Sequence, residues 1–172
     1  MWRWAYFPPV SVVPVEKPKH DKLELGWCGR MIEWKHVECA IEAIACLAPD
    51  TRAKCHLTLI GRGDQEAVLK RLAVDRGVAE FIDFKPAMTP EEIGVWMANL
   101  DVYLFPSDRG EGWGVVLAEA MDKCCVVIAC EEAGATLNLV KDGENGFVFK
   151  KGDVQCMADR ITYLVEHRAD CR

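Results

Sequence analysis

Short apolar runs alternate with amphipathic segments about six times along this chain, and this alternation limits its fold more than any other feature. The runs Cys55–Ile60 and Cys125–Ala129 are rich in apolar residues, which is typical of strands covered by helices on both sides. Strands that alternate with helices form parallel sheets. The sequence therefore predicts an α/β fold with an open parallel sheet, in which ligands bind at the carboxyl ends of the strands.

Local start and stop signals give the expected elements. Thr89 followed by Pro90 marks a helix start, because Thr caps helices and Pro suits the first helical position. Asp64 is a second candidate N-cap. The expected strands are Leu23–Gly29, Cys55–Ile60, Ala79–Phe84, Asp101–Phe105, Cys125–Ala129 and Gly146–Phe149. The expected helices are Lys35–Leu47, Asp64–Asp75, Pro90 to about Asn99, Val115–Lys123, Ala135–Val140 and Asp153–His167.

The length of 172 residues fits one domain of ordinary size. Residues 1–22 are predicted to be an irregular lead-in or interdomain connection, since prolines between residues 8 and 18 oppose a helix, and residues 23–172 form the domain. The net charge of −6 argues against a nucleic-acid partner. No apolar run approaches the ~18–20 residues of a membrane-spanning helix, so no transmembrane segment is expected.

The nine cysteines are scattered, odd in number and without a C-x-x-C pair. This pattern favours buried free thiols in a reducing cytoplasm over a disulfide scaffold or a zinc site. We therefore expect a cytoplasmic protein without a metal centre.

The segment Glu111–Glu119 follows an apolar strand and contains the turn Gly112-Trp113-Gly114. A strand that runs into a Gly-rich turn and then a helix presents backbone N–H groups and a positive dipole to an anion. One acid lies at this phosphate end and the other part-way along the helix, an arrangement that suits a nucleotide sugar. The alternative interpretation is two surface acids on an amphipathic helix, with Trp113 in ordinary packing.

Two further loops follow expected strands. Arg30 and Lys35 bracket the first loop and bring local positive charge, which could bind a phosphate. The alternative, that Arg30 pairs with an acid and Lys35 is solvated, fits the sequence equally well. The second, Gly61-Arg62-Gly63, lacks the third glycine of a dinucleotide-binding fingerprint, because Glu66 takes its place. A tight turn feeding a helix is favoured there over direct phosphate contact.

Five motifs between about Leu25 and Leu164 carry a family resemblance. They are Gly29-Arg30 with Lys35, Leu57–Gly63, Pro90–Ile93, Asp101–Ser107 and Glu111–Met121. In this order they resemble the C-terminal, donor-binding domain of family 4 GT-B glycosyltransferases. The resemblance implies a Rossmann-like open parallel sheet of about six strands with helices on both faces, one half of a GT-B fold. It also implies a retaining, metal-independent glycosyltransferase that uses a nucleotide-diphosphate sugar as donor substrate and no cofactor.

The resemblance also assigns roles to individual residues. Arg30 and Lys35 would hold the diphosphate and stabilise the leaving group, and Glu111 would contact sugar hydroxyls on the reacting face. Glu119 would accept hydrogen bonds from the ribose, and backbone near Lys85 and Pro86 would meet the base. The implied catalytic residues are Glu111, Arg30 and Lys35, and the implied donor-binding residues are Arg30, Lys35, Gly61, Gly63, Lys85, Pro86, Glu111, Gly112, Trp113, Gly114 and Glu119.

The chain departs from the family pattern at several places. His36 follows Lys35 where a glycine is common, Cys124-Cys125 stands where a glycine often precedes a strand, and Arg109 is an extra candidate for a phosphate or sugar contact. The family's N-terminal, acceptor-binding domain is absent from this sequence. We expect an acceptor glycan or lipid-linked sugar to bind through that half, so this chain alone is incomplete for catalysis, and association with the inner face of a membrane is left open.

Two other functions stay open. One is a catalytically inactive nucleotide-sugar-binding or interaction module; Arg30, Lys35, Glu111 and Glu119 together at strand ends argue against it, because a scaffold would have no reason to keep all four. Half of a GT-B-like epimerase or phosphorylase would share the architecture, and fold alone does not separate these enzymes. The motifs fit family 4 better, and no cofactor lysine signature is present.

Overall fold

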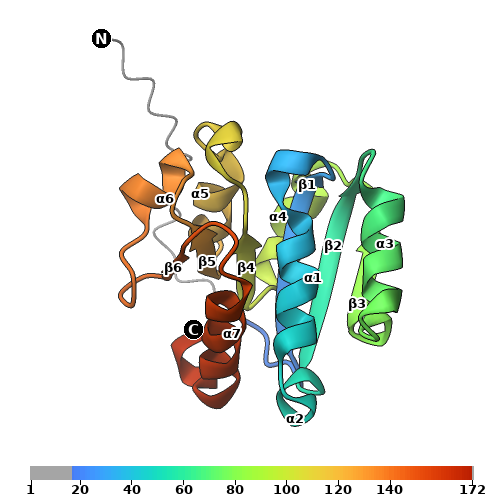
Figure 1. The fold of residues 1–172 in the computed structure, drawn as a ribbon. Helices are drawn as coiled ribbons and strands as arrows, with labels where there is room; N and C mark the ends of the chain where they lie inside the picture. The colour runs from blue at the N-terminus through green and yellow to red at the C-terminus, as the bar shows by residue number, and fades with distance from the viewer. Residues whose placement is uncertain (1–16, 172) are drawn as a thin grey trace.

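A six-stranded sheet in the order β3-β2-β1-β4-β5-β6 forms the centre of the computed structural model, which describes residues 17–171 (Figure 1). Every pair of neighbouring strands is parallel. The open parallel sheet predicted from the sequence is therefore confirmed. The strands are β1 (Leu23–Arg30), β2 (Cys55–Arg62), β3 (Ile82–Lys85), β4 (Val102–Phe105), β5 (Val126–Cys130) and β6 (Phe147–Phe149).

Helices cover both faces of this sheet, as expected. Alternate residues of β4 show the two layers: Val102 and Leu104 join the core under one set of helices, and Tyr103 and Phe105 join the core under the other. The first set is α1 (Val37–Cys46), α3 (Glu66–Asp75) and α7 (Val154–Glu166), and the second is α4 (Pro90–Ala98), α5 (Val115–Asp122) and α6 (Gly134–Leu139). Figure 1 shows α1 in front of the sheet and α4 behind it. A short helix, α2 (Pro49–Arg52), connects α1 to β2 and was not predicted.

Helix starts test the capping predictions. Thr89 is confirmed as an N-cap: its hydroxyl accepts from the N–H of Glu92 at 3.3 Å, and the Glu92 carboxylate accepts from the N–H of Thr89 at 2.8 Å. The prediction for Asp64 was wrong, because α3 begins at Glu66 and Gln65 occupies the cap position without a side-chain bond. The Gln65 N–H donates to the Met31 carbonyl of the β1–α1 loop at 3.1 Å, and this bond lies just before the first residue of the helix.

Several other element boundaries differ from expectation by one to three residues, and β2 continues through Gly61 and Arg62, where a turn was expected. Ala79–Phe81 is a 3₁₀ turn, and the strand begins at Ile82, the first residue of this segment that pairs with β2. The helix expected from Lys35 begins only at Val37, because Glu33–Lys35 is a 3₁₀ turn and His36 adopts a left-handed conformation between the two. This interruption shapes the candidate site.

Most of residues 17–22 have no regular structure, but Lys17 and His20 attach this segment to the domain. The buried Lys17 ammonium contacts the Leu100 carbonyl and lies 3.4 Å from the Cys125 sulfur. His20 bonds the Asn99 carbonyl at 2.9 Å. Residues 1–16 of the predicted lead-in lie outside the described residues, and the domain boundary at residue 22 stays a prediction.

The cysteines recorded between residues 17 and 171 are free thiols, and most are buried as expected. The prediction was wrong for Cys46 and Cys124, which are exposed. Between residues 17 and 171, no helix has both the length and the apolar character needed to cross a bilayer.

Candidate functional site

A cavity of about 1210 Å³ opens at the carboxyl ends of β1 and β2, beside the first turn of α5. The strand order reverses between β1 and β4, and open α/β sheets bind ligands at such reversals. The cavity combines charged and apolar walls. Its charged side chains are Arg30, Lys35, Arg62, Glu111, Glu119, Asp122 and Lys123, and its apolar ones include Ile60, Met88, Ile93, Met97 and Val116.

The sheet separates at this edge because β1 and β4 pair only briefly. β1 pairs with β2 along its whole length, but with β4 only at Leu25 and Gly26. Beyond that point the buried Tyr103 hydroxyl donates to the Cys28 carbonyl at 3.1 Å and accepts from the Cys28 N–H at 3.3 Å. One side chain thus satisfies the backbone groups that a longer β1–β4 ladder would pair. Burial raises the pKa of Tyr103 well above its ordinary value, so this hydroxyl stays neutral.

Lys35 and Glu111 form an ion pair across the cavity mouth. Lys35 ends the 3₁₀ turn after β1, and Glu111 ends the 3₁₀ turn Arg109–Glu111 after β4. The two side chains are only 16% and 11% exposed, so solvent weakens the pair less than it weakens a surface pair. An anion that binds Lys35 in this cavity therefore shares the ammonium group with a carboxylate.

The N-terminus of α5 forms another wall. Gly114 takes the cap position with φ 86°, and a β-carbon there would lie 2.5 Å from the Phe105 ring. No side chain caps this helix, and its first N–H groups have no partner within the helix. Since Val115 and Val116 of the first turn line the cavity, the arrangement suits an anion. Glu119 lines the same cavity farther along α5.

Gly61 allows close packing of β2 against β1, and Gly63 allows close packing of the loops that follow these strands. A β-carbon on Gly61 would lie 1.8 Å from the Gly29 carbonyl oxygen, and one on Gly63 would lie 2.1 Å from the Met31 carbonyl oxygen. Gly61 lines the cavity and Gly63 does not. The tight-turn interpretation therefore describes Gly63 better than phosphate contact does.

The predicted site residues fall into two groups. The cavity brings together Arg30, Lys35, Gly61, Glu111, Trp113, Gly114 and Glu119. Gly63, Lys85, Pro86 and Gly112 are not in its wall. Ala87 and Met88 line it instead of Lys85 and Pro86. The roles assigned to all of these residues stay predictions.

Two loop residues near Glu111 serve other contacts. The Gly112 carbonyl accepts a hydrogen bond from the N–H of Gly134 at 2.9 Å, which ties the Gly-rich turn to α6. Arg109 is 82% exposed, pairs with Glu132 at 3.4 Å and lies outside the cavity wall. The structure therefore gives no support to Arg109 as an extra ligand contact.

Sequence reasoning missed the apolar wall and Lys123. Ile93 and Met97 of α4 lie one turn apart, a spacing that looks the same for core packing and for a ligand surface. Cys28 also lines the cavity, but burial raises the pKa of its thiol to about 11, so it remains protonated and is no nucleophile.

Comparisons with known proteins agree with this geometry. The model of the family described as Glycosyl transferases group 1 matches residues 13–172. An uncharacterised glycosyltransferase of Methanocaldococcus jannaschii is 31% identical over 154 residues, which are 86% of this chain and 37% of the relative. Anabaena HepE, solved in complex with UDP, superimposes with a TM-score of 0.79 and 26% identity, over 88% of this chain and 41% of HepE.

A third match is itself a single domain. It is the C-terminal domain of a glycosyl transferase group 1 family protein, LpcC, from Francisella tularensis, with a TM-score of 0.77 and 27% identity over 86% of this chain and 77% of that domain. The chain thus spans about two fifths of the longer relatives and most of this domain. These matches confirm the resemblance to the C-terminal half of a GT-B glycosyltransferase. The chain belongs to the group 1 glycosyl transferase family.

Proposed function

We propose that this chain is the donor-binding half of a retaining glycosyltransferase that moves a sugar from a nucleotide-diphosphate sugar to an acceptor hydroxyl. One observation carries the proposal: Arg30, Lys35, Glu111 and the start of α5 all line one cavity at the reversal of strand order. The structure of HepE with UDP supports a nucleotide as the ligand of such a cavity, since HepE shares this fold.

The diphosphate would bind between the end of β1 and the start of α5. Arg30 has no carboxylate partner among residues 17–171, so its guanidinium is available for a bidentate phosphate contact. Lys35 adds a second positive charge, and the N–H groups at the start of α5 add their dipoles. As the bond between the anomeric carbon and the phosphate oxygen breaks, these groups stabilise the charge that develops on the leaving diphosphate.

The sugar and the nucleoside would extend in opposite directions from this point. Glu111, in contact with Lys35, would accept hydrogen bonds from sugar hydroxyls next to the reacting carbon. Glu119, farther along α5, would accept hydrogen bonds from the ribose. The base would lie against the apolar wall near Ala87 and Met88, where its flat faces replace water.

The acceptor would bind in an N-terminal domain outside this chain. This chain covers 37% of its Methanocaldococcus relative. That domain would bring the acceptor oxygen to the face of the sugar from which the diphosphate leaves, and so retain the anomeric configuration. Because Arg30, Lys35 and the N–H groups at the start of α5 would contact the diphosphate oxygens directly, the proposal includes no metal ion.

Calorimetry of the 172-residue chain with UDP, GDP and ADP tests donor binding. We expect one nucleoside diphosphate to bind with a measurable heat, and Arg30→Ala or Lys35→Ala to weaken it by about 10- to 150-fold for one lost charged hydrogen bond. If the folded chain gives no heat with any of the three, the proposal is wrong.

A second experiment tests the reaction on a longer protein that joins this chain to its N-terminal half. With an α-linked nucleotide sugar, nuclear magnetic resonance of the product should show an α linkage, and a chelator should leave the rate unchanged. A β-linked product would refute retention, and loss of activity on chelation would refute metal independence.

A further inference from the structure

His36 has an unusual backbone conformation directly after Lys35. Its φ of 47° and ψ of 40° lie in the left-handed region, which glycine adopts freely and which strains a residue with a β-carbon. Within residues 17–171, His36 and Cys124 are the two non-glycine residues that have a positive φ. The strain accounts for glycine being common at this place in the family. Contacts made by the imidazole of His36 therefore have to offset the strain of this backbone conformation.

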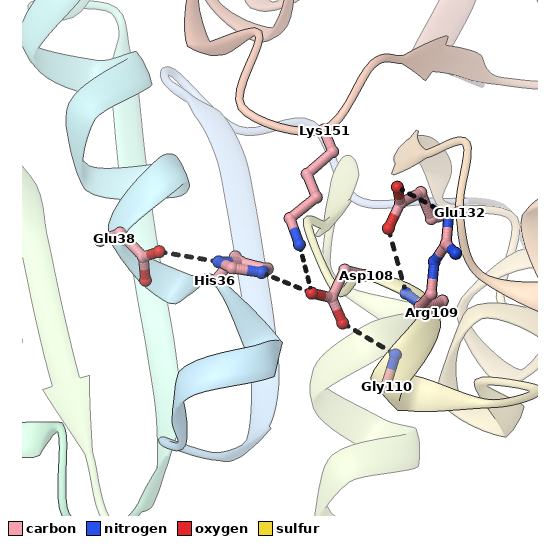
Figure 2. Close-up of polar contacts among 7 residues, drawn as sticks. All are labelled: His36, Glu38, Asp108, Arg109, Gly110, Glu132 and Lys151. Carbon is pink, nitrogen blue, oxygen red and sulfur yellow. Dashed lines mark hydrogen bonds and ion pairs between the residues drawn. The ribbon is translucent and has the colours of Figure 1, made fainter.

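Both ring nitrogens of His36 face carboxylates, as Figure 2 shows. Nδ1 lies 2.9 Å from Oε1 of Glu38 in the first turn of α1, and Nε2 lies 3.0 Å from Oδ2 of Asp108 after β4. A neutral imidazole has one N–H, whereas the protonated ring donates from both nitrogens. The observed geometry thus matches the imidazolium form.

Asp108 is the centre of this cluster (Figure 2). Its Oδ2 also accepts from the ammonium of Lys151 at 2.6 Å, and its Oδ1 accepts from the N–H of Gly110 at 2.8 Å. The second bond caps the 3₁₀ turn that ends at Glu111. Asp108 therefore connects the loops that follow β1, β4 and β6.

Three consecutive residues of the β1–α1 loop contact the segment Asp108–Glu111. The Trp34 carbonyl accepts from the N–H of Asp108 at 3.2 Å, the Lys35 ammonium pairs with Glu111, and the His36 ring bonds Asp108. The Lys35–Glu111 pair thus lies between two other attachments of the same two loops. If the His36 contact is lost, these loops keep fewer attachments beside the candidate phosphate site.

We propose that His36 is a positioning residue that fastens the loop of Lys35 to the loop of Glu111 through Asp108. It does not line the cavity, so it acts on a ligand only through the two residues that do. The inference rests on the proposed function, because it names what sets the position of the two groups assigned there to the diphosphate and the sugar.

This role depends on pH. Partial burial opposes protonation of His36, but the hydrogen bonds to Asp108 and Glu38 outweigh it and raise the pKa of the ring above its ordinary value. Lys151 stays charged, since its bond to Asp108 raises its pKa, and bonds from Lys151 and then from His36 lower the pKa of Asp108. Of this cluster, His36 changes charge near neutral pH. The attachment is complete at mildly acid pH and weakens as pH rises through the raised pKa.

Titrations of UDP, GDP and ADP into the wild-type chain and into His36→Asn test the proposal between about pH 5.5 and 8.5. Asn tolerates the left-handed conformation and keeps one N–H donor, but it does not titrate. We expect His36→Asn to bind the diphosphate about three- to tenfold more weakly at acid pH, with the ratio of the two dissociation constants falling toward one as pH rises. Ionisation of the ligand affects both proteins and cancels in this ratio.

Two further variants sharpen the test. His167→Asn makes the same substitution on a ring that is stacked on Tyr163 at the end of α7, away from the cavity, and should leave the ratio at about one. Asp108→Asn should also remove the pH dependence, and adding His36→Asn to it should cost little more, because both remove the same contact.

The outcomes separate this inference from the proposed function. If no nucleoside diphosphate binds to the wild-type chain, the proposed function fails and the inference fails with it. If wild type binds and the His36→Asn ratio is one at every pH, the inference alone is wrong. A lower melting temperature at acid pH with an unchanged ratio would show that His36 serves stability only, and would also overturn it.

Discussion

Removing the charge of Lys35 and removing the charge of Glu111 should change the affinity for a diphosphate in opposite directions. Lys35→Met removes the cation that the proposed site offers to a diphosphate, and Glu111→Gln removes the carboxylate that would compete for it while keeping the shape of the side chain. In the structure each group is the other's partner, and both are largely shielded from solvent. If the pair belonged to the scaffold alone, both substitutions would have the same sign or no effect.

The magnitude follows from the shared ammonium group. A carboxylate oxygen and a phosphate oxygen that each lie about 2.8 Å from the same nitrogen are about 5 Å apart. Two negative charges at that distance repel by about 3 kcal/mol at an effective dielectric constant of about 20, and by about half as much where water enters. Glu111→Gln should therefore tighten diphosphate binding by about 10- to 150-fold. Lys35→Met should weaken it by at least about tenfold for the lost charged hydrogen bond.

Calorimetry with the best-binding nucleoside diphosphate, without its sugar, measures both effects, because Glu111 is assigned a contact only to the sugar. Lys141→Met and Glu144→Gln provide matched controls, since this ion pair is 74% and 71% exposed and lies outside the cavity wall. Weaker binding by Glu111→Gln, similar to that of Lys35→Met, would refute the reasoning. It would show that the carboxylate does not compete with the ligand.

Three other substitutions test separate parts of the site and its support. Gly114→Ala should lower the free energy of unfolding by about 2–4 kcal/mol in denaturant titrations, from a left-handed φ and a β-carbon 2.5 Å from the Phe105 ring, and an unchanged midpoint would contradict the packing described. Glu119→Gln should weaken nucleoside diphosphate binding but leave inorganic pyrophosphate binding unchanged, as two parallel titrations would reveal; equal losses would place Glu119 near the phosphates. Thr89→Ala removes the capping box of α4 and should cost about 1 kcal/mol of stability without altering nucleotide affinity, and an affinity loss at constant stability would show that this helix start contacts the ligand.

Periodicity predicted the fold because the strands are apolar on both faces. Leu23, Leu25 and Leu57 lie in one core, and Ile60 and Cys28 of the same strands lie in the other. A pattern that buries both faces of every strand leaves helices on each side as the arrangement that covers the sheet. Apart from the unpredicted short helix α2, the element predictions failed at strand and helix ends, where local backbone bonds decide the boundary.

The site was predictable where parallel strands end, and less so beyond them. Arg30 and Glu111 follow strands whose carboxyl ends must share one edge, so their meeting in one cavity followed from topology. Lys85 and Pro86, predicted to meet the base, lie outside the cavity wall, and Ala87 and Met88 line it instead, because loop paths after a strand depend on local packing. The Lys35–Glu111 pair was not predicted at all, since side chains 76 residues apart carry no local signal of contact.

The structure explains two positions, His36 and Cys124, at which this sequence departs from the glycine common in the family. In the sequence, His36 and Cys124 are merely residues where glycine is common. In the structure, both have positive φ, so each marks a backbone position that favours glycine. His36 differs from Cys124 in having two carboxylate partners, whereas Cys124 is exposed. The same backbone rule thus points to a functional role for one residue and not for the other.

The balance of charge within the cavity bears on how a chain with a net charge of −6 would hold the proposed diphosphate. Lys35 is matched by Glu111, Arg62 by Glu66 and Lys123 by Asp122, while Arg30 has no acid partner among residues 17–171. A site whose cations are mostly matched is close to neutral, so its attraction for an anion acts only at contact distance. Selectivity then comes from geometry, through a bidentate guanidinium and fixed N–H groups, rather than from long-range attraction. If the proposed function holds, such a site would favour diphosphates whose sugar hydroxyls also bond Glu111 over free inorganic anions.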